Sequence, residues 1–91
     1  MVLIHTLSTA QKTIVYGKVF DAETKEALPF VNVAFKGSKV GTTTDLDGNY
    51  RIETYYAEDS LIASFVGYRP LAFKVERDES QKIVFPLTEG S

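Results

Sequence analysis

The chain has 91 residues and a formal net charge of −2 at pH 7, which fits one domain and argues against nucleic-acid binding, because phosphate contacts require concentrated positive charge. It contains no cysteine, so disulfide bridges, thiolate zinc sites and cysteine nucleophiles are excluded. A hydrophobic fraction of 44% with 24% charged residues indicates a globular chain, and no apolar run reaches the ~20 residues of a membrane-spanning helix.

The first eleven residues differ from the rest of the chain. A short apolar stretch precedes Ser8 and Ala10, small residues that fit the two specificity positions of a signal-peptidase site, which would make Gln11 the first mature residue. A basic start is missing, so residues 1–11 are interpreted as the remnant of a signal peptide or as a disordered tail. Residues 12–88 form the predicted domain, and residues 89–91 are typical of the start of a linker.

The domain is predicted to be entirely β-structure. Residues 12–88 are rich in Val, Ile, Thr, Tyr and Phe, and turn residues recur every ~8 to 12 positions, as in a sandwich or barrel. Apolar residues alternate in most segments, for example Val31, Val33 and Phe35, which is typical of sheets with one covered face. The seven predicted strands are residues 13–21, 30–36, 40–44, 50–54, 60–66, 70–77 and 81–88.

Several positions predict local geometry. Gly48 lies in a turn where a positive φ is expected, and Gly67 predicts a bend after the strand 60–66. That strand is apolar almost throughout, so we expect it to lie centrally with both faces covered. Pro86 cannot donate a ladder hydrogen bond, so the last strand is expected at an edge or with a bulge. The predicted fold is a seven-stranded antiparallel β-sandwich.

Four short motifs lie in order along the chain: Y-G-K-V-F-D at 16–21, E-A-L-P-F-V-N-V at 26–33, G-T-T-T-D-L-D-G-N-Y at 41–50 and S-F-V-G-Y at 64–68. Together they resemble the carboxypeptidase-regulatory-like domain, from about Thr13 to Leu87. The resemblance implies a transthyretin-like (prealbumin-like) sandwich, related in architecture to the Ig-like folds. One departure is Phe30, where the family often has glycine, so the local turn geometry is open there.

The resemblance is closest to the version of this domain found at the N-terminus of TonB-dependent outer-membrane transporters and related envelope proteins. It implies a non-catalytic accessory or interaction domain of a larger protein, in the periplasm or outer membrane of a Gram-negative bacterium. Its partners would be other domains of that protein and periplasmic or outer-membrane proteins. Two alternatives stay open, namely a glycan-binding or adhesion module and an accessory domain of a metallocarboxypeptidase or other hydrolase. We expect no enzymatic activity and no cofactor.

One segment superficially resembles a metal site. Asp45, Asp47 and Asn49 have the residue types of the first three ligands of a calcium-binding loop. The last loop position would fall on Tyr56, which cannot supply a bidentate carboxylate, and Gly48 is two positions too early. We therefore favour a tight turn in which aspartate side chains cap backbone amides.

Catalytic constellations are not found in the sequence. His5 is the only histidine, lies outside the predicted sandwich, and has no cysteine with which to build a zinc site. The adjacent carboxylates of residues 58–59 and 78–79 fall in predicted polar turns, where ordinary solvation is the favoured interpretation.

The tyrosines are the candidate binding residues. Tyr50 is expected in the core because it ends the G-T-T-T-D-L-D-G-N-Y motif, and Phe65 because it lies in the central strand. Tyr55 and Tyr56 are adjacent, so at least one is expected to be exposed and able to contact a sugar or a protein. Tyr68 follows the glycine bend and is expected to bond to backbone at a corner, as tyrosines do in other sandwiches. The predicted binding residues are Tyr55, Tyr56 and Tyr68.

Overall fold

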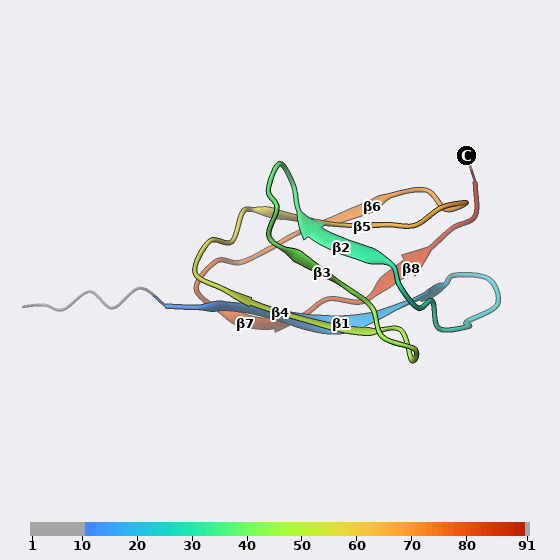
Figure 1. Cartoon of the computed structure of the whole chain (residues 1–91), viewed down its shortest axis with the longest axis horizontal. Helices are drawn as coiled ribbons and strands as arrows, with labels where there is room; N and C mark the ends of the chain where they lie inside the picture. The colour runs from blue at the N-terminus through green and yellow to red at the C-terminus, as the bar shows by residue number, and fades with distance from the viewer. Residues whose placement is uncertain (1–10, 91) are drawn as a thin grey trace, which may run out of the picture.

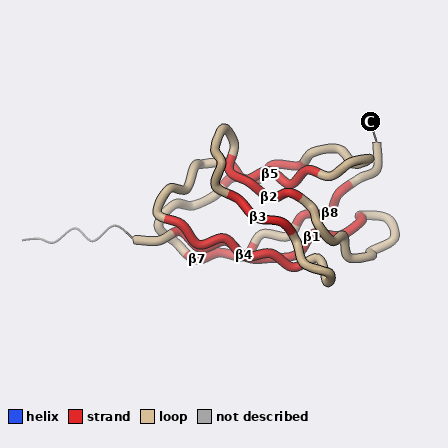
Figure 2. The backbone as a smooth tube through the Cα atoms, in the orientation of Figure 1, coloured by secondary structure: helices blue, strands red, loops and turns tan. Residues whose placement is uncertain are grey.

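The computed structural model describes residues 11–90, which form two sheets packed face to face (Figures 1 and 2). The first sheet has the order β4-β1-β7, with β8 also paired to β1, and the second has the order β3-β2-β5-β6. This part of the chain has no helix long and apolar enough to cross a membrane. The strands are β1 (Thr13–Asp21), β2 (Asn32–Phe35), β3 (Gly41–Thr43), β4 (Asn49–Thr54), β5 (Ser60–Ser64), β6 (Leu71–Lys74), β7 (Ser80–Lys82) and β8 (Phe85–Leu87).

The predicted all-β sandwich is confirmed, but its strand count and strand directions differ from the prediction. The predicted last strand, residues 81–88, is two strands, β7 and β8, and both run parallel to β1. On its other side β1 pairs antiparallel with β4. The first sheet is therefore mixed, and the two sheets together contain eight strands in the described residues instead of seven antiparallel ones. The sequence pattern missed this because alternation reports which face is buried and carries no information on the direction of the neighbouring strand.

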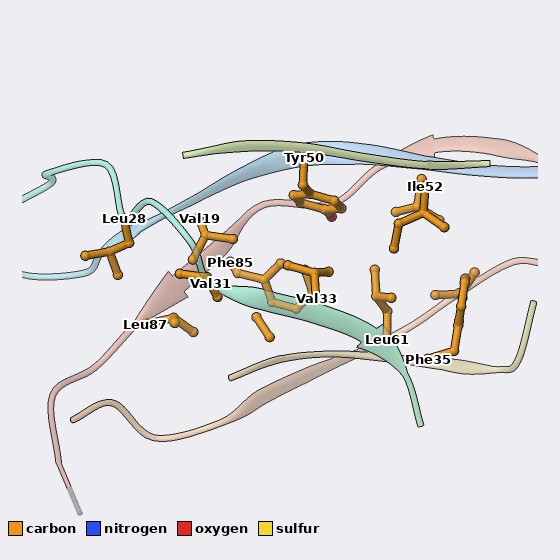
Figure 3. Packing of buried hydrophobic residues seen from close by; sticks show 13 residues of the cluster. Val19, Leu28, Val31, Val33, Phe35, Tyr50, Ile52, Leu61, Phe85 and Leu87 are labelled. Atoms are coloured by element: carbon orange, nitrogen blue, oxygen red, sulfur yellow. The ribbon is translucent and has the colours of Figure 1, made fainter. Parts of the chain in front are cut away.

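The core lies between the two sheets, and the side chains of both point into it (Figure 3). The predicted inward faces are confirmed at Val31, Val33 and Phe35, which are at most 2% exposed. Phe85 and Leu87 of β8 are completely buried, and Phe85 packs against the rings of Tyr50 and Phe73. Burying each such side chain stabilises the fold by about 1.5–3 kcal/mol. The buried apolar residues are Val15, Val19, Leu28, Val31, Val33, Phe35, Tyr50, Ile52, Leu61, Ala63, Val75, Phe85 and Leu87.

Strand β5 is central, as predicted, but only one of its faces is covered. It lies between β2 and β6, and Leu61 and Ala63 are fully buried. Ile62, on the opposite face, is only half-buried. The apolar run continues past the strand to Val66, which is 94% exposed in the turn before Gly67. The prediction that both faces are covered was wrong, because residues 11–90 provide no third layer over the outer face of this sheet.

Phe30 adopts the backbone conformation that glycine would favour. Its φ is +62° and its side chain is 64% exposed. A left-handed residue other than glycine costs about 1–2 kcal/mol, so this turn is strained. Hydrogen bonds from the backbone N–H groups of Phe30 and Val31 to the carbonyl oxygen and Oγ1 of Thr44 hold it in place.

The C-terminal segment passes very close to β1 at Gly17. Between β7 and β8, the N–H of Ile83 donates to the carbonyl oxygen of Tyr16 at 2.9 Å. The hydroxyl of Tyr50 donates to the carbonyl oxygen of Ile83 at 2.6 Å. A Cβ at Gly17 would overlap that same carbonyl oxygen and lie 3.3 Å from Cε1 of Tyr50. Only glycine lets the two backbones approach so closely.

We predict that Gly17→Ala destabilises the domain by about 3 kcal/mol, because the added methyl group must displace the Ile83 backbone from Tyr50. In a domain of this size the loss corresponds to a fall of roughly 15 °C in Tm. Thermal unfolding followed by circular dichroism measures it.

Gly37→Ala is the matched control, since a Cβ there meets nothing within 4 Å and adds only the strain of a φ of +71°. Its expected cost is about 1 kcal/mol. Equal Tm values for the two variants would contradict the close approach at Gly17.

Candidate functional site

The calcium-like segment forms a tight turn closed by its own backbone. Oδ1 of Asp45 accepts hydrogen bonds from the N–H groups of Asp47 and Asn49, both at 2.9 Å. Gly48 has a φ of +78°, as predicted, and its N–H donates to the carbonyl oxygen of Asp45 at 3.0 Å. One oxygen of the Asp45 carboxylate is therefore occupied by the turn. Within residues 11–90, no three acidic or histidine side chains converge as they would around a metal ion.

Tyr55 and Tyr56 both lie on the surface, in the loop after β4. Their side chains are 56% and 77% exposed, and the N–H of Tyr56 donates to Oγ1 of Thr54 at 2.9 Å. Successive side chains of a strand point to opposite faces of the sheet, which would have buried one of the two rings. Because β4 ends at Thr54, both rings lie outside the strand and both are exposed. Lys12 Nζ lies 5.5 Å from the centre of the Tyr55 ring, so a cation adjoins this aromatic pair.

Tyr68 is separated from the other two tyrosines. It lies in the turn between β5 and β6, whereas Tyr55 and Tyr56 lie between β4 and β5, so the length of β5 separates them (Figure 1). Its hydroxyl does not bond to backbone as expected, but donates to Oδ2 of Asp21 at 2.7 Å. The tyrosine that does bond to backbone across the fold is Tyr50, and burial raises its pKa well above the usual range.

Asp21 was not singled out from the sequence, although it ends the Y-G-K-V-F-D motif. Its side chain is only 5% exposed, and its Oδ1 accepts hydrogen bonds from the N–H groups of Glu23 and Thr24 at 2.8 and 3.0 Å. The bonds from the Thr24 N–H and the Tyr68 hydroxyl hold the pKa of Asp21 below its ordinary value. The same carboxylate raises the pKa of Tyr68 to about 12. Asp21 thus joins the end of β1 to a turn of the opposite sheet.

The same end of the sandwich also holds the last described residues. The N–H of Arg69 donates to the carbonyl oxygen of Thr88 at 2.9 Å, and the N–H of Gly90 donates to that of Gly67 at 3.0 Å. Glu89 forms a β-bridge with Tyr68. These contacts fix the path of the chain up to residue 90. We call the residues that make them, together with Asp21, the exit cluster: Asp21, Gly67, Tyr68, Arg69, Thr88, Glu89 and Gly90.

The adjacent carboxylates of the two polar turns are exposed. Glu58, Asp59, Asp78 and Glu79 all lie on the surface. Oδ1 of Asp59 pairs with Nε of Arg77 at 3.2 Å, an exposed ion pair worth at most about 1 kcal/mol. His5 lies outside the described residues.

Comparison with protein families and with proteins of known sequence gives consistent matches. The profile of the CarboxypepD_reg-like domain family matches residues 15–91. TonB-dependent receptor P3 of Formosa agariphila is 33% identical over 90 residues, which cover 99% of this chain and 9% of the receptor. TonB-dependent receptor SusC of Bacteroides thetaiotaomicron is 41% identical over 61 residues, 67% of this chain and 6% of the receptor. The chain therefore spans less than a tenth of the length of these relatives.

Solved structures share the fold at low sequence identity. The Bacillus anthracis TIE protein superimposes with a TM-score of 0.60 at 18% identity, over 87% of this chain and 17% of that protein. A streptococcal ancillary pilin superimposes with a TM-score of 0.55 at 19% identity, over 89% of this chain and 30% of the pilin. At these identities the likeness establishes the sandwich fold alone.

We predict that the Asp21 carboxylate makes the fold sensitive to acid. A pKa lowered on folding stabilises the native state above the unfolded pKa of about 3.9, and this contribution is lost as the pH falls below that value. Above about pH 5, Asp21→Asn should melt at a lower Tm than the wild type, and the difference should shrink as the pH falls through the lowered pKa of Asp21 in the folded state.

Asp47→Asn is the control for this titration, because the Asp47 carboxylate is exposed and accepts no hydrogen bond from residues 11–90. It should keep the acid dependence of the wild type. If the Tm of the wild type and that of Asp21→Asn changed with pH in parallel, the charge of Asp21 would contribute nothing to the stability of the fold.

Proposed function

Because the chain belongs to the CarboxypepD_reg-like domain family, we propose that it is a non-catalytic interaction domain of a TonB-dependent receptor. The observation that carries the proposal is the match to receptor P3, which includes 99% of this chain but only 9% of the receptor. We place the domain on the periplasmic side of the outer membrane, as an extension preceding the transporting part.

The exit cluster supports a role in positioning the next part of the receptor. Hydrogen bonds hold Thr88 and Gly90 against the Gly67–Arg69 turn of the opposite sheet. A chain held in this way leaves the sandwich in a defined direction instead of through a flexible tether. Tyr68 contributes here through its bond to Asp21, and we assign it to holding the chain exit.

At the other end of the sandwich, Tyr55 and Tyr56 are proposed to contact a protein partner. Both rings are exposed, and tyrosine anchors interfaces well because its ring is large and loses little conformational entropy. The same two rings favour the second candidate, a glycan-binding module, since an exposed aromatic face also stacks on sugars. The metal-loop residues Asp45, Asp47 and Asn49 have a structural role in this proposal, as a turn.

We predict that deleting residues 11–88 from the full-length receptor lowers uptake of its ligand several-fold while leaving the amount of receptor in the outer membrane unchanged. Replacing both Tyr55 and Tyr56 by Ala should reproduce part of this loss without affecting the Tm of the domain, because both rings are exposed. Uptake and receptor abundance are measured together.

Val66→Ala is the matched control, since Val66 is 94% exposed in the turn between β5 and β6. Normal uptake by the deletion variant would refute the interaction role. Saturable binding of the isolated domain to oligosaccharides, lost in the Tyr55 and Tyr56 variant, would favour the glycan module instead.

A further inference from the structure

The outward face of the first sheet carries a row of two cations flanking a tyrosine. The strand register places Arg51 of β4 and Lys82 of β7 opposite Tyr16 of β1, one on each side. Lys18 lies two residues further along β1, on the same face. These four residues, Tyr16, Lys18, Arg51 and Lys82, define the cationic face. Neighbouring strands are about 4.8 Å apart, so the row spans about 10 Å across the sheet.

The cationic face is hollowed and accessible. A shallow depression of about 640 Å³ is lined by all four of its residues together with Asn49 and Ser80. Tyr16 is 43% exposed, and the strand register places Arg51 and Lys82 on the two sides of it. The hollow is open to solvent, so it suits an extended segment lying on the surface more than a small molecule enclosed by it.

The charge of this face contrasts with that of the chain. The whole chain carries a net charge of −2, but the one acidic residue on this side of β4, Glu53, is shared by Lys12 at 3.4 Å and Arg51 at 3.2 Å. Within residues 11–90, Lys18 and Lys82 have no carboxylate within ion-pair distance. Positive charge is therefore in excess here, although the molecule as a whole is acidic.

We propose that the cationic face binds an extended acidic peptide segment of a protein partner. Carboxylates of the segment pair with Lys18, Arg51 and Lys82, and its backbone or an apolar side chain lies on the Tyr16 ring. Arginine and lysine only donate hydrogen bonds, which suits carboxylates. A sugar would need acceptors for its hydroxyl groups as well, and besides the Tyr16 hydroxyl and the Tyr50 hydroxyl, which is bonded to Ile83, the hollow offers neutral polar side chains at Asn49 and Ser80 alone. This inference rests on the proposed interaction role and names the surface and the partner chemistry.

The test uses the 91-residue chain and a fluorescent peptide of alternating Glu and Ser, titrated by fluorescence anisotropy at about 20 mM and about 500 mM NaCl. We expect saturable binding that weakens at least tenfold at the higher salt concentration. Arg51→Gln and Lys82→Gln should each weaken binding about threefold, and Tyr16→Ser should weaken it further. All three side chains are exposed, and unchanged Tm values would establish that the variants are folded.

Lys36→Gln is the matched control, because Lys36 is exposed beside β2 on the other sheet. Absence of peptide binding, or equal weakening by Lys36→Gln and Lys82→Gln, would overturn the proposal. Tighter binding of polygalacturonate than of the peptide would also overturn it, in favour of an acidic glycan.

The two proposals fail differently in the full-length receptor. One outcome is that the double variant with Arg51→Gln and Lys82→Gln has normal uptake while deletion of residues 11–88 lowers uptake. The domain then has an interaction role that does not use the cationic face. If the deletion also leaves uptake normal, the interaction role itself fails, whatever the isolated chain binds.

Discussion

The close approach of two backbones at Gly17 is the contact on which the first sheet depends. The chain returns from the second sheet and pairs in parallel with the start of β1 as β7, then with its end as β8. Between the two it passes the inner side of Gly17, where the Tyr50 hydroxyl holds the Ile83 carbonyl oxygen. This passage lets β8 bring Phe85 and Leu87 into the core, where both are fully buried. Without it, the core would lose one of its two largest fully buried side chains.

The same return path determines how the two ends of the sandwich differ. At one end, the continuation of β8 is held by backbone hydrogen bonds to the turn around Tyr68, and Asp21 adds a bond between the sheets. At the other end, Tyr55 and Tyr56 lie exposed in a loop that makes few hydrogen bonds. The fixed end suits a connection to another part of a receptor, and the exposed loop suits contact with a partner. The cationic face lies along the sheet between these ends, on β1, β4 and β7.

Much of the fold could be predicted because burial leaves a period-two signal in the sequence. The alternation around Val33 identified the inner face of the second sheet, and Gly48 was correctly expected at a positive φ. The missing N–H of Pro86 agrees with β8 having, among the strands of residues 11–90, β1 as its one neighbour. The parallel pairing of β7 and β8 was missed because strand direction depends on contacts distant in the sequence. The strained Phe30 shows the limit of a family pattern, since the chain keeps the backbone conformation without the glycine.

The candidate sites were less predictable than the fold. Adjacency predicted that at least one of Tyr55 and Tyr56 is exposed, and both are exposed because β4 ends before them. The separation of Tyr68 from them depends on which turn each occupies. The hydrogen bond between Asp21 and Tyr68 joins residues 47 positions apart, so no local sequence pattern predicts it. The cationic face was invisible for the same reason, because Arg51, Tyr16 and Lys82 come together only through the register of three strands. Sequence patterns report burial and turns, whereas sites on the outer face of a sheet are assembled by register.

Native-state hydrogen exchange of individual amides tests most directly whether the C-terminal segment is locked onto β1. The N–H of Val19 bonds to the Gly48 carbonyl on the β4 side, and those of Ile83 and Ala22 make the bonds on the β7 and β8 side. If the passage at Gly17 is integral to the fold, all three amides exchange only through global unfolding and share one free energy of opening. Exchange of Ile83 and Ala22 with a much lower opening free energy than Val19 would mean that the segment detaches while the sandwich stays folded, which would contradict the account.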